Sequence, residues 1–114
     1  MKMKLPAGDR AVVEIAKLRD YCLNPTHPRG RHKARMFLST LGLTQTDAAF
    51  LHGQLLEAAR NGEAVLGEAD QYGERYWIDF PLRHDSRQAT VRSAWIVLRV
   101  DRIPRLTSCY VLLD

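Results

Sequence analysis

Two basic residues at the start of a predicted helix are suited to binding and acting on a phosphate. His32 and Lys33 follow the loop 24–30, which contains two prolines and ends in Gly30. A helix N-terminus presents free amide groups and a partial positive charge, which attract anions. His32 adds a group that transfers protons near neutral pH, and Lys33 adds a fixed positive charge. The pair indicates acid/base chemistry on a phosphate, although a charge run is also typical of a solvated basic face.

The apolar stripe of this helix separates the two candidates. Ala34, Phe37 and Leu41 recur at helical spacing and mark the face that turns toward the core. His32 points nearly opposite that stripe, whereas Lys33 lies on its flank. A residue on the flank reaches a groove beside a sheet more easily than one on the outer face. Geometry therefore favours Lys33 as the functional residue.

Arg92 is a second candidate, because it lies in a segment with the pattern of a central strand. Thr90, Arg92 and Ala94 share one face of this strand, and Trp95 lies on the other. A half-buried guanidinium needs an acidic partner or an anionic ligand. Two interpretations stay open. Arg92 stabilises charge on a phosphate in a transition state, or it forms a structural ion pair, for which Asp79 is the expected partner.

A third candidate group lies near the C-terminus. Strand alternation predicts Arg105, Thr107 and Cys109 on one face and Ser108 and Tyr110 on the other. The hydroxyl of Thr107 or Ser108 is suited to orienting a scissile phosphate, and Tyr110 to donating a hydrogen bond. The alternative is an ordinary edge strand, because these residue types are also common β-formers.

The elements that must position these residues change type halfway along the chain. Helices are predicted over 14–23, 31–41 and 44–60 from apolar spacing, with Gly42 as a C-cap and a capping-box-like start at Thr44 and Asp47. Strands are predicted over 63–69, 76–81, 90–100 and 106–113, with a polar loop at 83–88. This order predicts a single α+β domain over 1–114, with two to three N-terminal helices packed on an antiparallel sheet of about four strands.

Composition narrows the chemistry further. No run of about 18 apolar residues and no apolar segment behind the N-terminal charges occurs, which predicts a cytoplasmic protein outside membranes. Cys22 and Cys109 are expected to be buried free thiols. The histidines show no ligand spacing with them, and phosphate-cradling glycine motifs are missing, so we expect neither metal nor cofactor. A metal-free ribonuclease needs only an acid, a base and a cation, because RNA carries its own nucleophile, the 2′-hydroxyl.

The net charge of +4 is unevenly spread. Basic residues concentrate at 29–35 and again along the late strands, and a fold that joins the two sets would create one basic cleft. This asymmetry fits an anionic partner such as RNA, DNA or an acidic protein, although a merely soluble basic protein fits it equally well. The residues expected to contact nucleic acid are Arg29, Arg31, Arg35, Arg105, Tyr110 and Trp95.

Several motifs resemble a bacterial domain family of unassigned function. They are NPTHPRGRHKARMF at 24–37, LGLT at 41–44, YG at 72–73, YWID at 76–79, TVRSAWI at 90–96 and PRLTSCYV at 104–111. Members of this family occur as small standalone proteins and as C-terminal tips of polymorphic or contact-dependent toxins. The similarity extends over most of the chain, from about residue 11 to 112.

The resemblance implies a function. The layout of helices before a sheet is similar to that of barnase-like, colicin-type and RelE/ParE-like toxins. It implies a toxin that is a metal-independent ribonuclease, often acting on tRNA, neutralised by a small acidic antitoxin or immunity protein. Lys33, Arg92 and Thr107 or Ser108 match positions that the family tends to keep, and His32 matches many members. The alternatives are a non-catalytic nucleic-acid- or protein-binding module, with Trp77 or Trp95 as a stacking residue, and an antitoxin-like structural partner.

Overall fold

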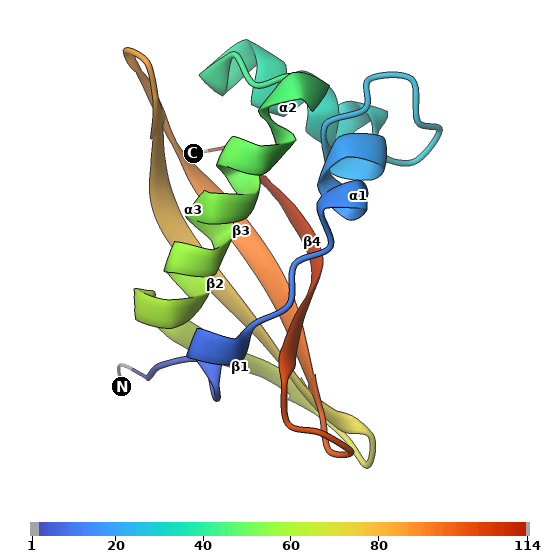
Figure 1. Ribbon diagram of the computed structural model, residues 1–114, viewed down its shortest axis with the longest axis vertical. Coiled ribbons are helices and arrows are strands. Elements are labelled where there is room, and N and C mark those ends of the chain that lie inside the picture. The colour runs from blue at the N-terminus through green and yellow to red at the C-terminus, as the bar shows by residue number, and fades with distance from the viewer. Residues whose placement is uncertain (1–2, 114) are drawn as a thin grey trace.

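The computed structural model describes residues 3–113 and places the helices on one face of a four-stranded antiparallel sheet (Figure 1). The helical elements are the 3-10 turn Gly8–Arg10, α1 Ile15–Lys17 continuing as a π-helical turn over Leu18–Cys22, α2 Arg31–Leu41, the 3-10 turn Gln45–Asp47 and α3 Ala48–Asn61. The strands are β1 Ala64–Ala69, β2 Gly73–His84, β3 Arg87–Leu98 and β4 Pro104–Val111, hydrogen-bonded in that order. The predicted α+β fold is confirmed.

The second helix spans the predicted residues, whereas the predicted third helix begins as the 3-10 turn Gln45–Asp47 and becomes α-helical only from Ala48. α2 buries its apolar stripe and ends at Gly42, which adopts the left-handed φ of 69° that glycine accepts without strain. The entry to α3 is a capping box, in which the backbone N–H of Thr44 donates to the Asp47 carboxylate at 2.8 Å.

The predicted first helix forms, but its last turn is wider than an α-helix. The N–H of Leu23 donates to the carbonyl of Leu18 at 2.8 Å, which is the five-residue step of a π-helix. This turn buries Leu18 and Cys22 in the core and leaves Tyr21 half-buried at the border of the core. The π-turn thereby presents Tyr21 toward the loop that follows it.

The prediction of a polar loop at 83–88 is wrong. β2 and β3 continue through this segment as a hairpin, with only Asp85 and Ser86 at the turn. His84 Nδ1 lies 2.6 Å from the carbonyl of Leu41, and Arg87 donates to the carbonyl of Leu38 at 3.3 Å. The polar side chains at this end of the hairpin therefore contact carbonyl groups in the last turn of α2.

A β-bulge in β4 overturns the predicted alternation there. Ser108 pairs with Ala94, whereas Leu106 pairs with Trp95, so Thr107 is the extra residue. After the bulge, Cys109 points to the core instead of sharing a face with Thr107, and Ser108 and Tyr110 lie on the opposite face. The bulge changes which β4 side chains face the solvent side of the sheet.

The core lies between the helices and the inner face of the sheet, and Trp95 and Phe37 are its largest buried side chains. Cys22 and Cys109 are buried and free, as predicted. The other face of the sheet has no helix over it among the described residues, and Val65 on that side is 43% exposed. Residues 3–113 contain no helix with the length and apolar character needed to cross a bilayer.

Candidate functional site

The loop between the π-turn and α2 is held by the side chain of His27. Its Nδ1 accepts hydrogen bonds from the backbone N–H groups of Arg29 and Gly30, both at 3.0 Å, and its carbonyl accepts from the N–H of Arg31 at 3.0 Å. These bonds use amide groups of the loop and of the first residue of α2. The backbone N–H groups of His32 and Lys33 form no hydrogen bond with the described residues, so the first turn of α2 still presents two amide groups to an anion.

The same bonds define the proton on His27. Because Nδ1 accepts from two backbone donors, it carries no proton, and the neutral ring must carry its proton on Nε2. His27 can therefore donate a hydrogen bond to a ligand through Nε2. It is not suited to act as a general base, because its unprotonated nitrogen is already occupied.

Tyr21 links His27 to Lys33. The ammonium of Lys33 donates to the phenol oxygen of Tyr21 at 2.9 Å and lies 4.8 Å from the centre of its ring. On its other side, the Tyr21 ring meets the His27 ring edge-on, with centroids 4.8 Å apart. Since its oxygen accepts from Lys33, the phenol keeps its own O–H to donate to a ligand.

These side chains line a hollow at the edge of β4. Lys17, Tyr21, His27, Arg29 and Thr107 surround about 480 Å³. Lys33 lines an adjoining hollow of about 260 Å³ together with His32, Met36, Tyr110 and Val111. We call Lys17, Tyr21, His27, Arg29 and Lys33 the edge cluster.

The edge cluster has excess positive charge. Within residues 3–113, Lys17, Arg29 and Lys33 form no ion pair with a carboxylate. Five other cations are paired with acidic side chains, namely Arg19, Arg75, Arg92, Arg102 and Arg105. Only part of the expected basic cleft therefore forms, and it forms at the β4 edge. These three cations, together with the O–H of Tyr21 and the Nε2–H of His27, form an arrangement that is suited to binding a phosphate.

Arg92 lies on the open face of the sheet and is bound to Asp79. Its guanidinium donates two hydrogen bonds to the carboxylate, at 2.8 and 2.9 Å, and lies over the ring of Trp77 at 5.2 Å from its centre. The hydrogen bonds that Arg92 donates to Asp79, with a smaller contribution from Tyr110, raise the pKa of Arg92 above its usual range. The ion pair that the sequence indicated is present, and a phosphate at Arg92 must share the guanidinium with Asp79.

The two candidate hydroxyls of β4 differ in their surroundings. The Thr107 hydroxyl is exposed at the bulge and donates to the carbonyl of Ala94 at 3.1 Å. The Ser108 hydroxyl is buried and has no hydrogen-bond partner among the described residues. Thr107 therefore lies in the wall of the hollow, whereas Ser108 presents no hydroxyl to the surface.

The residues expected to contact nucleic acid also differ, because some are exposed at the hollows or along α2 and others are paired or buried. Arg29 and Tyr110 line the hollows, and Arg31 and Arg35 are exposed along α2. Arg105 is paired with Asp101 at 2.6 Å. The stacking role expected of Trp95 is wrong, because its side chain is only 1% exposed and its indole N–H donates to the buried Ser93 hydroxyl.

Sequence reasoning missed three members of the edge cluster, namely Lys17, Tyr21 and His27. For Tyr21 a signal exists in Gly30, where a Cβ atom would lie 2.2 Å from the Tyr21 carbonyl oxygen. Only glycine lets the loop close onto Tyr21, so a glycine after two prolines indicates close contact with the preceding element. Lys17 carries no such signal.

Lys33 also acts on the core beneath it. The neighbouring Cys109 thiol lowers the pKa of Cys22, and the positive charge of Lys33 adds to the effect. Cys22 belongs to the π-turn and Cys109 to β4. The thiol pair therefore lies under the edge cluster, where the helical layer meets the sheet.

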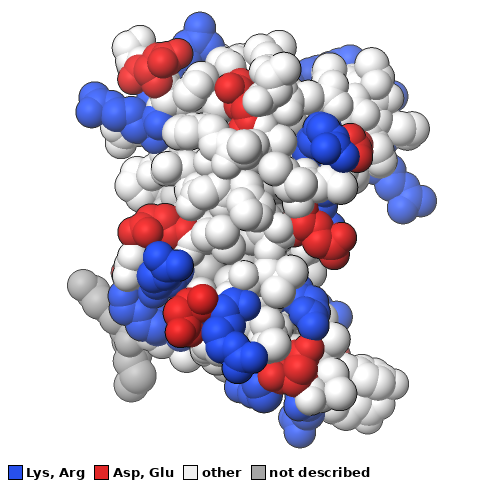
Figure 2. All heavy atoms as spheres, viewed as in Figure 1, with Lys and Arg blue, Asp and Glu red and all other residues white. Residues whose placement is uncertain are grey.

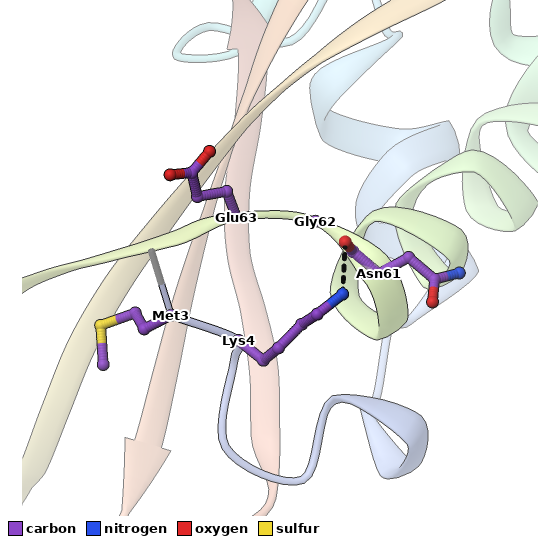
Figure 3. A pocket seen from close by; sticks show the side chains of 5 residues that line it. All are labelled: Met3, Lys4, Asn61, Gly62 and Glu63. Carbon is purple, nitrogen blue, oxygen red and sulfur yellow. Dashed lines mark hydrogen bonds between the residues drawn. The ribbon is translucent and has the colours of Figure 1, made fainter. Parts of the chain in front are cut away.

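Two other regions offer less chemistry. A hollow of about 290 Å³ lies beside Met3 and Glu63, but Lys4 there donates to the carbonyl of Asn61 at 2.9 Å (Figure 3). On the face covered by the helices, basic and acidic side chains alternate around an uncharged centre (Figure 2). Within residues 3–113, no three His, Cys, Asp or Glu side chains converge as metal ligands.

The comparisons with known proteins address the family and not the chemistry. No curated protein matches the chain significantly. No solved structure matches it either. A family model described as a domain of unknown function, DUF6883, matches residues 4–113. Because the match extends over nearly the whole chain, the protein belongs to the DUF6883 family.

Proposed function

We propose that the edge cluster binds an RNA phosphate and that the protein is a metal-independent endoribonuclease, the toxin of a toxin–antitoxin or immunity pair. The observation that carries the proposal is the cluster itself. Lys17, Arg29 and Lys33 lie around hollows at the β4 edge without carboxylate partners among the described residues. Tyr21 and His27 add hydrogen-bond donors to that charge.

The proposed chemistry uses the 2′-hydroxyl of RNA as the nucleophile. His32 accepts its proton, because the ring of His32 is exposed beside Lys33 and forms no hydrogen bond with the described residues. The 2′-oxygen bonds to phosphorus, the bond to the 5′-oxygen breaks, and a 2′,3′-cyclic phosphate remains. Tyr21 gives its proton to the leaving 5′-oxygen, and the ammonium of Lys33 stabilises the phenolate.

Cleavage of purified RNA in the presence of EDTA tests this proposal. The wild-type protein should cleave a labelled RNA and leave a cyclic phosphate end. Lys33→Ala should slow cleavage by about 10²–10³-fold, as loss of one transition-state donor does. Tyr21→Phe keeps the ring and removes the proton donor, and should slow it by about 10²–10⁴-fold. Arg60→Ala, which removes an exposed charge from the last turn of α3, serves as the control and should cleave normally.

Two results would refute the assignment. If RNA stays intact with the wild-type protein and cells that express it grow normally, the proposed ribonuclease activity is refuted. If Lys33→Ala keeps full activity and unfolds thermally like the wild type, the edge cluster is not the site of cleavage. The proposal also places the protein in the cytoplasm with tRNA or other translation RNA as substrate, and a small acidic antitoxin should restore growth.

A second candidate function is a non-catalytic RNA-binding module. It is favoured by Arg92, whose guanidinium is already bound by Asp79, and by Thr107, whose hydroxyl is bound to the backbone. Salt-sensitive RNA binding by wild type and by Tyr21→Phe alike, without cleavage by either, would support this function over the ribonuclease.

A further inference from the structure

The open face of the sheet contains a hollow that the edge cluster does not include. It measures about 250 Å³, and Trp77, Arg92, Ala94, Thr107 and Tyr110 are among its lining residues. Ala94 pairs with Trp77 on β2 and with Ser108 on β4, and Tyr110 lies two residues further along β4, opposite Arg92. Ala94 adds only a methyl group to the lining, whereas Trp77 and Tyr110 add aromatic rings.

The walls are suited to a flat aromatic group. Trp77 is half-buried, and its indole N–H forms no hydrogen bond with the described residues. Arg92 is held in place by Asp79, and its planar guanidinium lies over the Trp77 ring, so its outer plane is available for stacking. Nucleobases stack on aromatic rings and on guanidinium planes. A hollow of about 250 Å³ is large enough for one heterocycle.

The hollow is also joined to the basic edge. Thr107 lines both this hollow and the one formed by Lys17 and Arg29, and Tyr110 lines both this hollow and the one formed by Lys33. A base in the open-face hollow would therefore place its own sugar and phosphate across β4, next to the edge cluster. Adjacent strands lie about 4.8 Å apart, a separation that one nucleotide spans.

We propose that the hollow over Ala94 binds one unpaired nucleobase of RNA, adjacent to the phosphate held by the edge cluster. The proposal rests on the proposed function, because it takes RNA as the ligand. It adds that recognition is of a single-stranded nucleotide and that Trp77 contacts it. Since Trp95 is buried and the chain has two tryptophans, Trp77 is also the fluorescent reporter of this site.

The test compares two hexamers of equal charge, both 2′-O-methylated so that they lack the nucleophile. One has randomised bases and the other is abasic. The hexamer with bases should bind about tenfold or more tightly than the abasic one and change the Trp77 fluorescence, as stacking on an aromatic ring does. Ala94→Ile, which fills the hollow with a good strand former, should reduce its affinity to that of the abasic hexamer. Thr90→Ile adds similar bulk to the same face outside the hollow and should change nothing.

The outcomes separate this proposal from the proposed function. If both hexamers bind equally and Lys33→Ala weakens both, the phosphate site stands and the base site is wrong. If Ala94→Ile binds the randomised hexamer as tightly as the wild type, the base site is again wrong. If neither hexamer binds the wild-type protein, both proposals fail, and the open face is left for a protein partner. Trp77→Phe should abolish the fluorescence change and keep most of the affinity.

Discussion

Arg92 is engaged on two sides before any ligand arrives, by the Asp79 carboxylate and by the Trp77 ring. The side chains of Arg92 and Asp79 are 32% and 34% exposed, so solvent screens their attraction. Exposed pairs of this kind contribute about 0.2–1 kcal/mol to stability. The ion pair therefore orients Arg92 with little effect on folding, and a phosphate competes with a carboxylate that is weakly held.

Asp79→Asn should therefore strengthen RNA binding. The amide keeps the size of the side chain and removes the negative charge, so the guanidinium becomes available to a phosphate. We expect a lower Kd for a short single-stranded RNA at low salt and a loss of unfolding free energy of at most about 1 kcal/mol. Fluorescence titration and urea unfolding measure the two effects.

The control for this prediction is Asp101→Asn. It makes the same change in net charge and breaks the comparable pair with Arg105, which does not line the open-face hollow. A gain in affinity common to both variants would mean that net charge alone is responsible. Weaker binding by Asp79→Asn than by the wild type would mean that Asp79 is needed to hold Arg92 in its binding position.

At the scale of elements, the loop that carries the edge cluster depends on one glycine. Gly30 is buried, and an added Cβ would lie 2.2 Å from the Tyr21 carbonyl oxygen, so backbone must move to admit it. Gly30→Ala should lower the free energy of unfolding by about 1–3 kcal/mol, as overpacking does. Because the displaced loop carries His27, RNA cleavage should fall as well. Chemical denaturation and the cleavage assay measure the two losses.

Gly53→Ala is the matched control for this substitution. Gly53 is exposed within α3, and a Cβ there would meet nothing within 4 Å. Alanine in a helix interior is favoured over glycine by about 0.5–1 kcal/mol, so this variant should be more stable than the wild type and equally active. Unchanged stability of Gly30→Ala would contradict the tight approach of the loop to Tyr21.

The elements also differ in how far the sequence predicts them. The apolar stripe of α2 and the Thr44–Asp47 capping box are local patterns, and both form as predicted. The bulge at Thr107 depends on pairing between β3 and β4, which no residue type marks, so the faces of Cys109 and Ser108 were misassigned. The segment 83–88 has a loop-like composition, yet it is a hairpin because its polar groups bind the C-terminus of α2.

In the candidate site, too, local sequence predicts the position of some residues, whereas other contacts arise only from the tertiary fold. Lys33 could be predicted, because helical spacing alone places it on the flank of the apolar stripe. The bond from Lys33 to Tyr21 could not, because the two residues lie on different elements and meet only when the loop closes. For the same reason, the sequence placed Trp95 at the surface, since strand type and length give no measure of which face the helices cover.

At the scale of the whole molecule, the net charge of +4 predicts attraction to RNA but not where RNA binds. Five arginines are engaged in ion pairs, and on the helical face charges of both signs alternate (Figure 2). The unpaired cations of the edge cluster are Lys17, Arg29 and Lys33. Because these three cations lie together around the hollows at the β4 edge, we expect RNA to be held there, with few phosphates contacted.

The salt dependence of RNA binding measures the number of phosphates that the protein contacts. Each phosphate neutralised on a single strand contributes about −0.7 to the slope of log affinity against log salt, so three cations predict a slope of about −2. Replacing Lys17, Arg29 or Lys33 by alanine should reduce the slope by about 0.7 in each case. Arg60→Ala, near the C-terminal end of α3, should leave it unchanged. A much steeper wild-type slope to which Arg60 also contributes would mean that RNA is held by the overall charge, and the edge cluster would lose its special role.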